Sequence, residues 1–238
     1  MSFEDLFWDS MANDKTYRRG QVEWALWQFA TIEFNTGENA QKDLRIRLKH
    51  LLEIDREGAP FGKEVFRRAR VHALSSSAPE GTGVDIDFSA FDAFCIAIAL
   101  DLLRTGFKQS EVMILMGRIR GLLEQPFQQI LENPPPRRPH GNKVEPQPAR
   151  HADRHVFLVV ERVEASERHA EYATGKYARV PLNIEPRVFV GVPALSDYMA
   201  TMDHVFRRAI VVEIAQIAAR LTEFLEKAPK ISRGRSRK

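Results

Sequence analysis

The chain has 238 residues, one cysteine, 44% hydrophobic residues and a formal net charge of +3. This length allows one large domain or two modest ones, and the apolar fraction is sufficient for a core. A single cysteine excludes an intramolecular disulfide. The sequence contains no run of about 18 uninterrupted apolar residues, so we expect no membrane span. The acidic N-terminus MSFEDLFWDSM lacks the basic and apolar regions of a secretory signal. We therefore expect a soluble, cytoplasmic protein.

The charge is unevenly distributed along the chain. Residues 1–132 carry 16 Lys/Arg against 20 Asp/Glu, whereas residues 133–238 carry 19 against 12. Within the acidic first half, residues 40–70 hold nine basic and five acidic residues. Because each phosphate contact is local and releases counterions, such a local basic region is a better indication of nucleic-acid binding than the total charge.

A proline-rich segment interrupts the chain. Residues 133–154 contain six of the 13 prolines and almost no apolar residues, so they predict a linker. It would separate a domain over 1–132 from a dimerisation or sensing domain over 155–228, with a basic disordered tail at 229–238. The expected fold class is mainly α with a small β component: a winged helix-turn-helix N-terminal domain and a small α+β C-terminal domain.

Three helices are predicted at the N-terminus: Ser2–Met11, a second that starts near Thr16–Gly20, and a third from about Ala40 to Asp55. In the third helix, leucines repeat at helical spacing along one side. Basic residues recur at spacings of three, four and seven on the opposite side: Lys42, Arg45, Lys49 and Arg56. This pattern predicts an amphipathic helix with a basic outer face.

The next segment has strand character. Val71–Leu74 and Val84–Phe88 flank a turn-rich stretch, which predicts a hairpin. Two strong helices follow. The first is capped by Ser89 and ends at Gly106, and the second runs from about Gln109 to Leu123, with a break at Pro126.

The C-terminal part begins with two apolar strands, Val156–Val160 and Arg187–Val192. A long helix is predicted from about Leu195 to Glu226. One interpretation is that this helix packs across the sheet. The other is that its distal half, from Ile210 onward, pairs with the same helix of a second chain in a homodimer.

Two stretches resemble MerR-type transcriptional regulators. Gly83–Met116 looks like the wing-to-helix region of that family, with the stop Leu102-Leu103-Arg104-Thr105-Gly106-Phe107 followed by Gln109-Ser110-Glu111-Val112. Tyr17-Arg18-Arg19-Gly20-Gln21-Val22 is similar to the family's opening strand and first helix. The resemblance implies a winged helix that binds DNA. The connection from Ala30 to Asn39 is longer than the family's tight turn, which leaves the position of the recognition helix open.

The predicted DNA contacts are basic or hydroxyl-bearing residues near the third helix and the hairpin. They are Arg18, Arg19, Gln21, Lys42, Arg45, Arg47, Lys49, Arg67, Arg68, Arg70, Ser76 and Ser77. The alternative is that the basic helix is a solvated face paired with Asp43 and Glu53, and that the serines only form a loop.

Catalytic patterns are not found. The chain has no P-loop, dinucleotide fingerprint, nucleophile elbow or H-E-x-x-H motif. Cys95 lies on an apolar helical face, His151 and His155 lack a third ligand, and Asp85 and Asp87 lack a third acid. We therefore expect that the protein is not an enzyme and binds no cofactor and no metal.

The main hypothesis is a sequence-specific regulator of duplex DNA, with an effector of unknown kind. The alternatives are a protein–protein adaptor without direct DNA readout and an enzyme on an unfamiliar α+β domain.

Overall fold

The computed structural model describes residues 15–34, 38–57, 72–76, 86–136, 153–163, 186–201 and 207–230. Over these residues the chain is mainly helical with a small antiparallel β component, as the sequence predicted. None of the described helices is long and apolar enough to cross a membrane. The elements in chain order are β1 (Tyr17–Arg18), α2 (Arg19–Phe34), α3 (Glu38–Glu57), β2 (Asp87–Phe88), α5 (Ala90–Arg104), α6 (Gln109–Glu132), β3 (Val156–Val163), β4 (Pro186–Val190), α8 (Val192–Thr201), β5 (Arg207–Glu213) and α9 (Ala215–Lys227).

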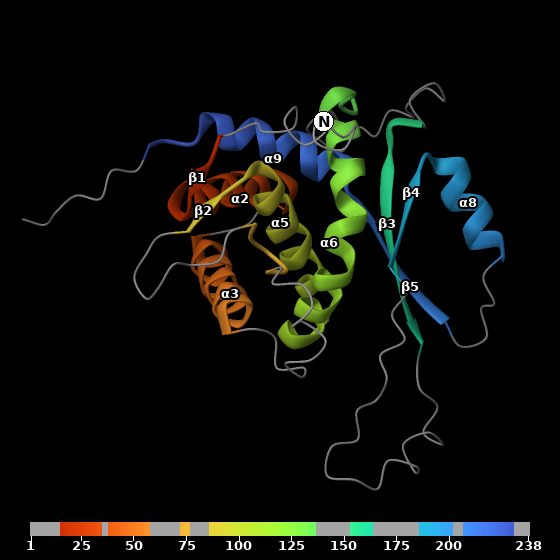
Figure 1. Cartoon of the computed structure of the whole chain (residues 1–238), viewed down its shortest axis with the longest axis horizontal. Coiled ribbons are helices and arrows are strands. Elements are labelled where there is room, and N and C mark those ends of the chain that lie inside the picture. Colours follow the sequence, from red (N-terminus) through yellow and green to blue (C-terminus); the bar gives the residue numbers. More distant parts are fainter. Residues whose placement is uncertain are drawn as a thin grey trace, which may run out of the picture.

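Helix α2 begins beside a short antiparallel sheet (Figure 1). Tyr17 of β1 pairs with Phe88 of β2, and both aromatic side chains are buried. Helix α2 continues past Ala30 to Phe34, since no glycine or proline interrupts it before Gly37. Only residues 35–37 therefore separate α2 from α3, and the expectation of a longer connection was wrong.

Helices α5 and α6 are joined by a four-residue turn. Ser89 caps α5 in a capping box with Asp92, and Gly106 leaves the helix at a φ of +95°, a conformation that glycine adopts readily. The predicted break at Pro126 does not occur, and α6 continues to Glu132. Proline removes only one backbone donor there, while the buried side chains of Phe127 and Ile130 hold the last turns against the core.

The predicted hairpin is replaced by a different arrangement. Residues 72–76 form bends and not a strand, and within the described residues 86–88 of the second predicted strand, Asp87–Phe88 is extended and pairs with β1. The reason is that the backbone N–H groups of Ala73 and Leu74 bind the carboxylate of Asp55, so they are not available to a neighbouring strand. The connecting loop, residues 77–85, and the predicted helix Ser2–Met11 lie outside the described residues.

The C-terminal sheet has the strand order β4–β3–β5, with both pairs antiparallel. Its two predicted strands are confirmed, although β3 extends to Val163 and β4 ends at Val190, before α8 begins at Val192. In Figure 1 the sheet stands between α6 and α8, and both helices contact β4. The face with Val156, Leu158 and Val160 belongs to the hydrophobic core.

The predicted long helix from Leu195 to Glu226 was wrong. The chain instead forms α8, strand β5 and α9 over this region. The sequence RRAIVVE of β5 contains consecutive β-branched residues, and all seven residues pair with β3, so strand pairing overrides the helical periodicity. Ile210 lies in that strand, and the apolar residues Leu221 and Leu225 of α9 are buried within the same chain. The structure thus removes the helix on which the expected dimer depended.

Helix α9 returns to the N-terminal half of the molecule. It packs against α2, α5 and α6 and lies across them in Figure 1. One continuous cluster of buried apolar side chains extends from Tyr17 to Leu225, so it includes residues on both sides of the proline-rich segment. The side chain of Gln216 on α9 also donates a hydrogen bond of 2.9 Å to the carbonyl of Pro136.

Candidate nucleic-acid interface

Helix α3 has one buried and one exposed side. Its leucines at 44, 48, 51 and 52 are at most 8% exposed and belong to the core. Away from these leucines the helix exposes four of the predicted DNA contacts, with Arg45 and Arg47 toward opposite edges, and we call these residues the basic side of α3: Lys42, Arg45, Arg47 and Lys49. The helix thus anchors itself by its leucines and presents four cations to solvent.

Two ion pairs cross this surface. Arg45 lies 3.7 Å from Glu23 of α2, and Lys49 lies 3.6 Å from Glu53 one turn later. Both basic side chains are 60% exposed. Exposed pairs at these distances contribute at most about 1 kcal/mol, so an incoming phosphate could compete for either cation.

The predicted contacts at the start of α2 have local roles. The side chain of Gln21 accepts a hydrogen bond of 3.1 Å from the backbone N–H of Arg18. Arg19 forms an ion pair of 2.9 Å with Glu23, whose other carboxylate oxygen faces Arg45. Glu23 therefore brings Arg19 to the edge of the basic side of α3, while Gln21 closes the first turn of α2.

A shallow hollow of about 580 Å³ borders the other edge of the basic side of α3. Arg47 and Ile54 of α3 line it together with residues in and beside the α5–α6 turn, namely Leu103, Phe107, Lys108, Gln109 and Ser110. Sequence reasoning missed Lys108, although its place in a short turn between two strong helices was visible. The hollow thus adds a fifth cation and the first turn of α6 to the surface.

Burial affects an ion pair near this edge. The pKa of Arg104, at the end of α5, is lowered mainly by burial, with the nearby Arg47 acting in the same direction and Asp101 opposing it. The pKa of Asp101 is raised overall, because the effect of burial exceeds the opposing effect of the Arg104 charge. The two side chains lie 3.8 Å apart. Arg47 of α3 and Arg104 of α5 are therefore close enough for electrostatic repulsion between them.

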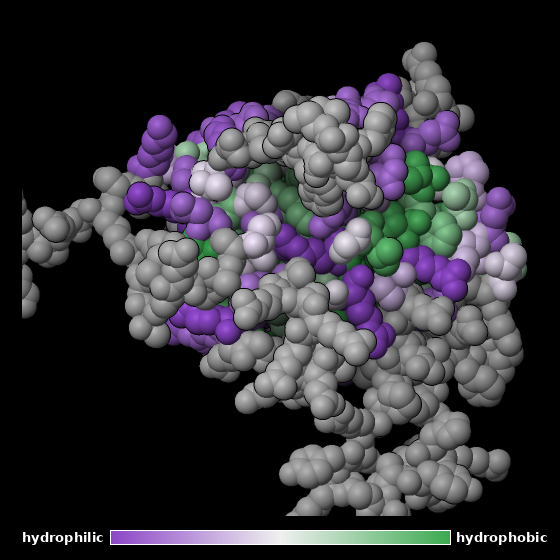
Figure 2. Space-filling view, in the orientation of Figure 1, coloured by the Kyte–Doolittle hydropathy of each residue, from purple (hydrophilic) through white to green (hydrophobic). Residues whose placement is uncertain are grey.

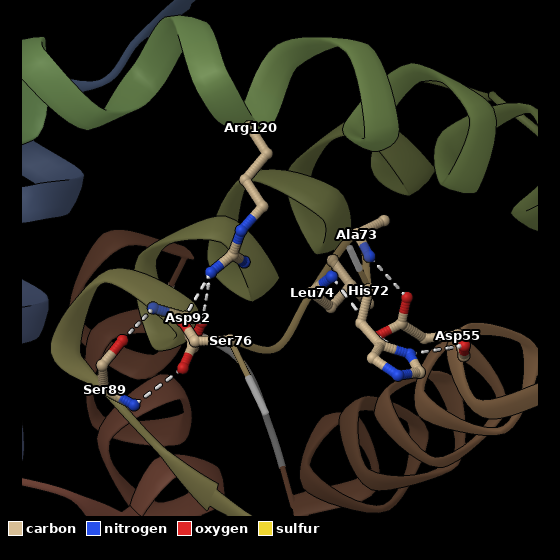
Figure 3. Close-up of polar contacts among 8 residues, drawn as sticks. All are labelled: Asp55, His72, Ala73, Leu74, Ser76, Ser89, Asp92 and Arg120. Atoms are coloured by element: carbon tan, nitrogen blue, oxygen red, sulfur yellow. Dashed lines mark hydrogen bonds and ion pairs between the residues drawn. The ribbon is translucent and has the colours of Figure 1, made fainter. Parts of the chain in front are cut away.

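Residues 72–76, which we call the strap, lie between α3 and α5–α6 and are fixed from α3 by Asp55 (Figure 3). The carboxylate of Asp55 accepts hydrogen bonds from the N–H groups of Ala73 at 2.7 Å and Leu74 at 3.3 Å. Its backbone carbonyl lies 3.1 Å from Nδ1 of His72. Burial raises the pKa of Asp55, although the backbone bond from Ala73 and the charge of His72 act to lower it.

The other end of the strap is fixed from α5 and α6. Ser76 is exposed as a residue, but its hydroxyl points inward, donates to Asp92 and accepts from Arg120, both at 2.8 Å. The second carboxylate oxygen of Asp92 accepts the N–H of Ser89 at 2.8 Å. Arg120 also lies over the ring of Phe91, 4.9 Å from its centroid. Ser76, which the sequence assigned to DNA, is thus engaged inside the protein.

Other candidate residues are placed as follows. Arg67, Arg68, Arg70 and Ser77 lie outside the described residues and stay predictions. Cys95 is buried, and its burial raises its pKa to about 12. His155 lies 3.4 Å from Glu213 and stacks on Phe157. Among the described parts of the chain, no three His, Cys, Asp or Glu side chains are grouped as metal ligands would be.

Exposed apolar residues occur both on α3, where Ile46 is 43% exposed, and at the other end of the molecule. Val190 and Val192, at the turn from β4 into α8, are 52% and 44% exposed. Figure 2 shows a hydrophobic area over this end of the molecule and hydrophilic residues over the helical end. Comparison with protein-family models and with curated proteins finds no match to this chain.

Proposed function

We propose that this protein binds duplex DNA as a transcriptional regulator, with the basic side of α3 as its main contact surface. One observation carries the proposal: Lys42, Arg45, Arg47 and Lys49 are all exposed on a helix whose opposite side is anchored in the core. A helix of 20 residues is about 30 Å long and fits the major groove of B-DNA.

The surroundings of α3 support this proposal. The short connection between α2 and α3, the β1–β2 pairing and the following α5–α6 pair are compatible with a winged helix-turn-helix. Lys108 lies across the hollow from α3, where it could reach a backbone phosphate beside the groove. Arg67, Arg68, Arg70 and Ser77 remain proposed contacts in the segments that flank the strap.

The test compares two triple variants that lose the same charge. One replaces Lys42, Arg45 and Lys49 by alanine, and the matched control replaces the exposed residues Arg154, Lys227 and Lys230. Binding to fluorescent duplexes from the source genome is measured by anisotropy over a range of salt concentrations. We expect the α3 variant to lose at least tenfold in affinity, and the slope of log K against log salt to fall by about 2 to 3. The control should bind like the wild type.

Circular dichroism checks that both variants are folded. A folded α3 variant with the affinity and salt slope of the wild type would exclude this helix from the interface. A wild-type protein that binds no duplex even at low salt would overturn the proposed function and would favour the protein–protein adaptor.

A further inference from the structure

The strap is a short segment held by two carboxylates that come from different helices. Asp55 on α3 binds the backbone of Ala73 and Leu74, and Asp92 on α5 binds the hydroxyl of Ser76. Arg120 on α6 binds both Asp92 and Ser76. Side chains of α3, α5 and α6 thus converge on the strap, as can be followed in Figure 3.

These polar groups lie among core residues. Asp55 is 7% exposed, Asp92 is 1% exposed, and both Ala73 and Leu74 of the strap belong to the hydrophobic cluster. Burial of a charged group costs desolvation, so well-packed apolar side chains would stabilise the fold at least as well. What the carboxylates add is direction, because each accepts particular N–H or O–H groups in one geometry. The cluster therefore restricts where the strap can lie relative to α3, α5 and α6.

The strap is also placed to influence DNA binding. Asp55 projects into the protein from the side of α3 opposite Lys42 and Lys49, so its bonds set the position of the helix from behind.

We propose that Asp55 and Ser76 are positioning residues for DNA binding: by holding the strap between α3 and α5–α6, they keep the basic side of α3 in the position relative to α5–α6 that duplex DNA requires. This inference rests on the proposed function. It assigns Ser76 a role inside the protein, in place of the direct DNA contact that the sequence predicted. A surface that is already arranged loses less conformational freedom on binding and therefore binds more tightly.

The experiment uses the full chain with Asp55→Asn and Ser76→Ala. Ser76→Thr is the conservative variant that keeps the hydroxyl, and Thr201→Ala is the matched control, because it removes an exposed hydroxyl that donates to the carbonyl of Tyr198 within α8. Ser76→Ala leaves the Asp92–Arg120 pair and the cap of α5 in place, so we expect its melting temperature to fall by only a few degrees. Anisotropy on duplex DNA gives the affinity, and NMR hydrogen exchange follows the amides of Ala73 and Leu74.

We expect Asp55→Asn and Ser76→Ala each to weaken DNA binding at least fivefold under conditions where both are folded, and to speed exchange of the strap amides at least tenfold. Ser76→Thr and Thr201→Ala should match the wild type in both measurements. Asp55 is buried and cannot touch DNA. If it only stabilised the fold, the folded Asp55→Asn variant would bind DNA with the affinity of the wild type, so a loss of affinity indicates a positioning role.

Two results would overturn the inference alone. If Asp55→Asn is folded and binds with wild-type affinity, the strap does not position the interface. If only Ser76→Ala loses affinity, without faster exchange of the strap amides, Ser76 contacts DNA directly. Failure of the wild type itself to bind duplex DNA would instead overturn the proposed function and the role of the strap with it.

Discussion

Asp92 of α5 and Arg120 of α6 form an ion pair in which carboxylate Oδ1 lies 2.5 Å from guanidinium Nη2. The side chains are 1% and 8% exposed. Each charge is therefore compensated mainly by the other and by the hydroxyl of Ser76. Such a pair adds little net stability, but the loss of one partner leaves the other as an uncompensated charge in the protein interior, which solvates it poorly.

Replacement of Arg120 by methionine should therefore destabilise the protein strongly. We expect a loss of about 3–5 kcal/mol in the free energy of unfolding, because Asp92 is left buried without its counter-ion. Urea denaturation measures the change, and Arg118→Met, at an exposed position two residues earlier, is the control. The double variant with Asp92→Asn should lose less than the sum of the two single changes, and simple additivity would contradict the coupling.

Asp55 should give the stability of the protein a particular pH dependence. Burial raises its pKa in the folded state above the ordinary value of 3.8, so the folded protein binds the proton more tightly than the unfolded chain does. The stability of the wild type relative to Asp55→Asn should therefore decrease as the pH rises from 3.8 through the raised pKa, and be constant above it. Denaturation curves of both proteins at a series of pH values test this. A relative stability that increases with pH would mean that the bonds from Ala73 and Leu74 outweigh burial.

Cys95 should be chemically silent in the folded protein. Its pKa of about 12 leaves very little thiolate, and the side chain is fully buried in α5. Because the thiolate is the reactive form, we expect a chromogenic disulfide reagent at about pH 8 to label it only at the rate of unfolding. Since the chain has no other cysteine, the signal is unambiguous. Rapid labelling without denaturant would show that α5 opens readily.

Helix α9 should be required for the stability of the N-terminal half. Leu221 is 1% exposed where α9 meets the helical core, and its replacement by alanine should cost about 2–5 kcal/mol. Leu122, which is 46% exposed on α6, is the control, and its replacement should change stability by less than about 0.5 kcal/mol. Equal, small effects at both positions in chemical denaturation would contradict the docking of α9.

Local patterns were sufficient to predict several elements. The leucine repeat of α3, the cap at Ser89 and the stop at Gly106 each act within a few residues, so they could be read without knowledge of the fold. The basic side of α3 was predictable for the same reason. Its opposite side carries the leucines, and an amphipathic helix must bury them.

Other features depended on residues that are distant in the sequence. The segment 207–213 has both helical periodicity and β-branched residues, and the availability of β3 as a pairing partner decided between the two. The same holds for Ala73 and Leu74, whose N–H groups found a carboxylate 18 and 19 residues earlier in place of a second strand.

The sequence by itself determined that α3 is an amphipathic helix with a basic outer side, because helical spacing places every fourth residue on the same side whatever surrounds it. Only the tertiary structure decided what lies behind and beside that helix. Asp55, Asp92 and Arg120 come from three helices, and nothing in their sequence spacing indicates that they meet at the strap. A buried charge requires a partner at hydrogen-bond distance, and which partner it finds depends on how the helices pack.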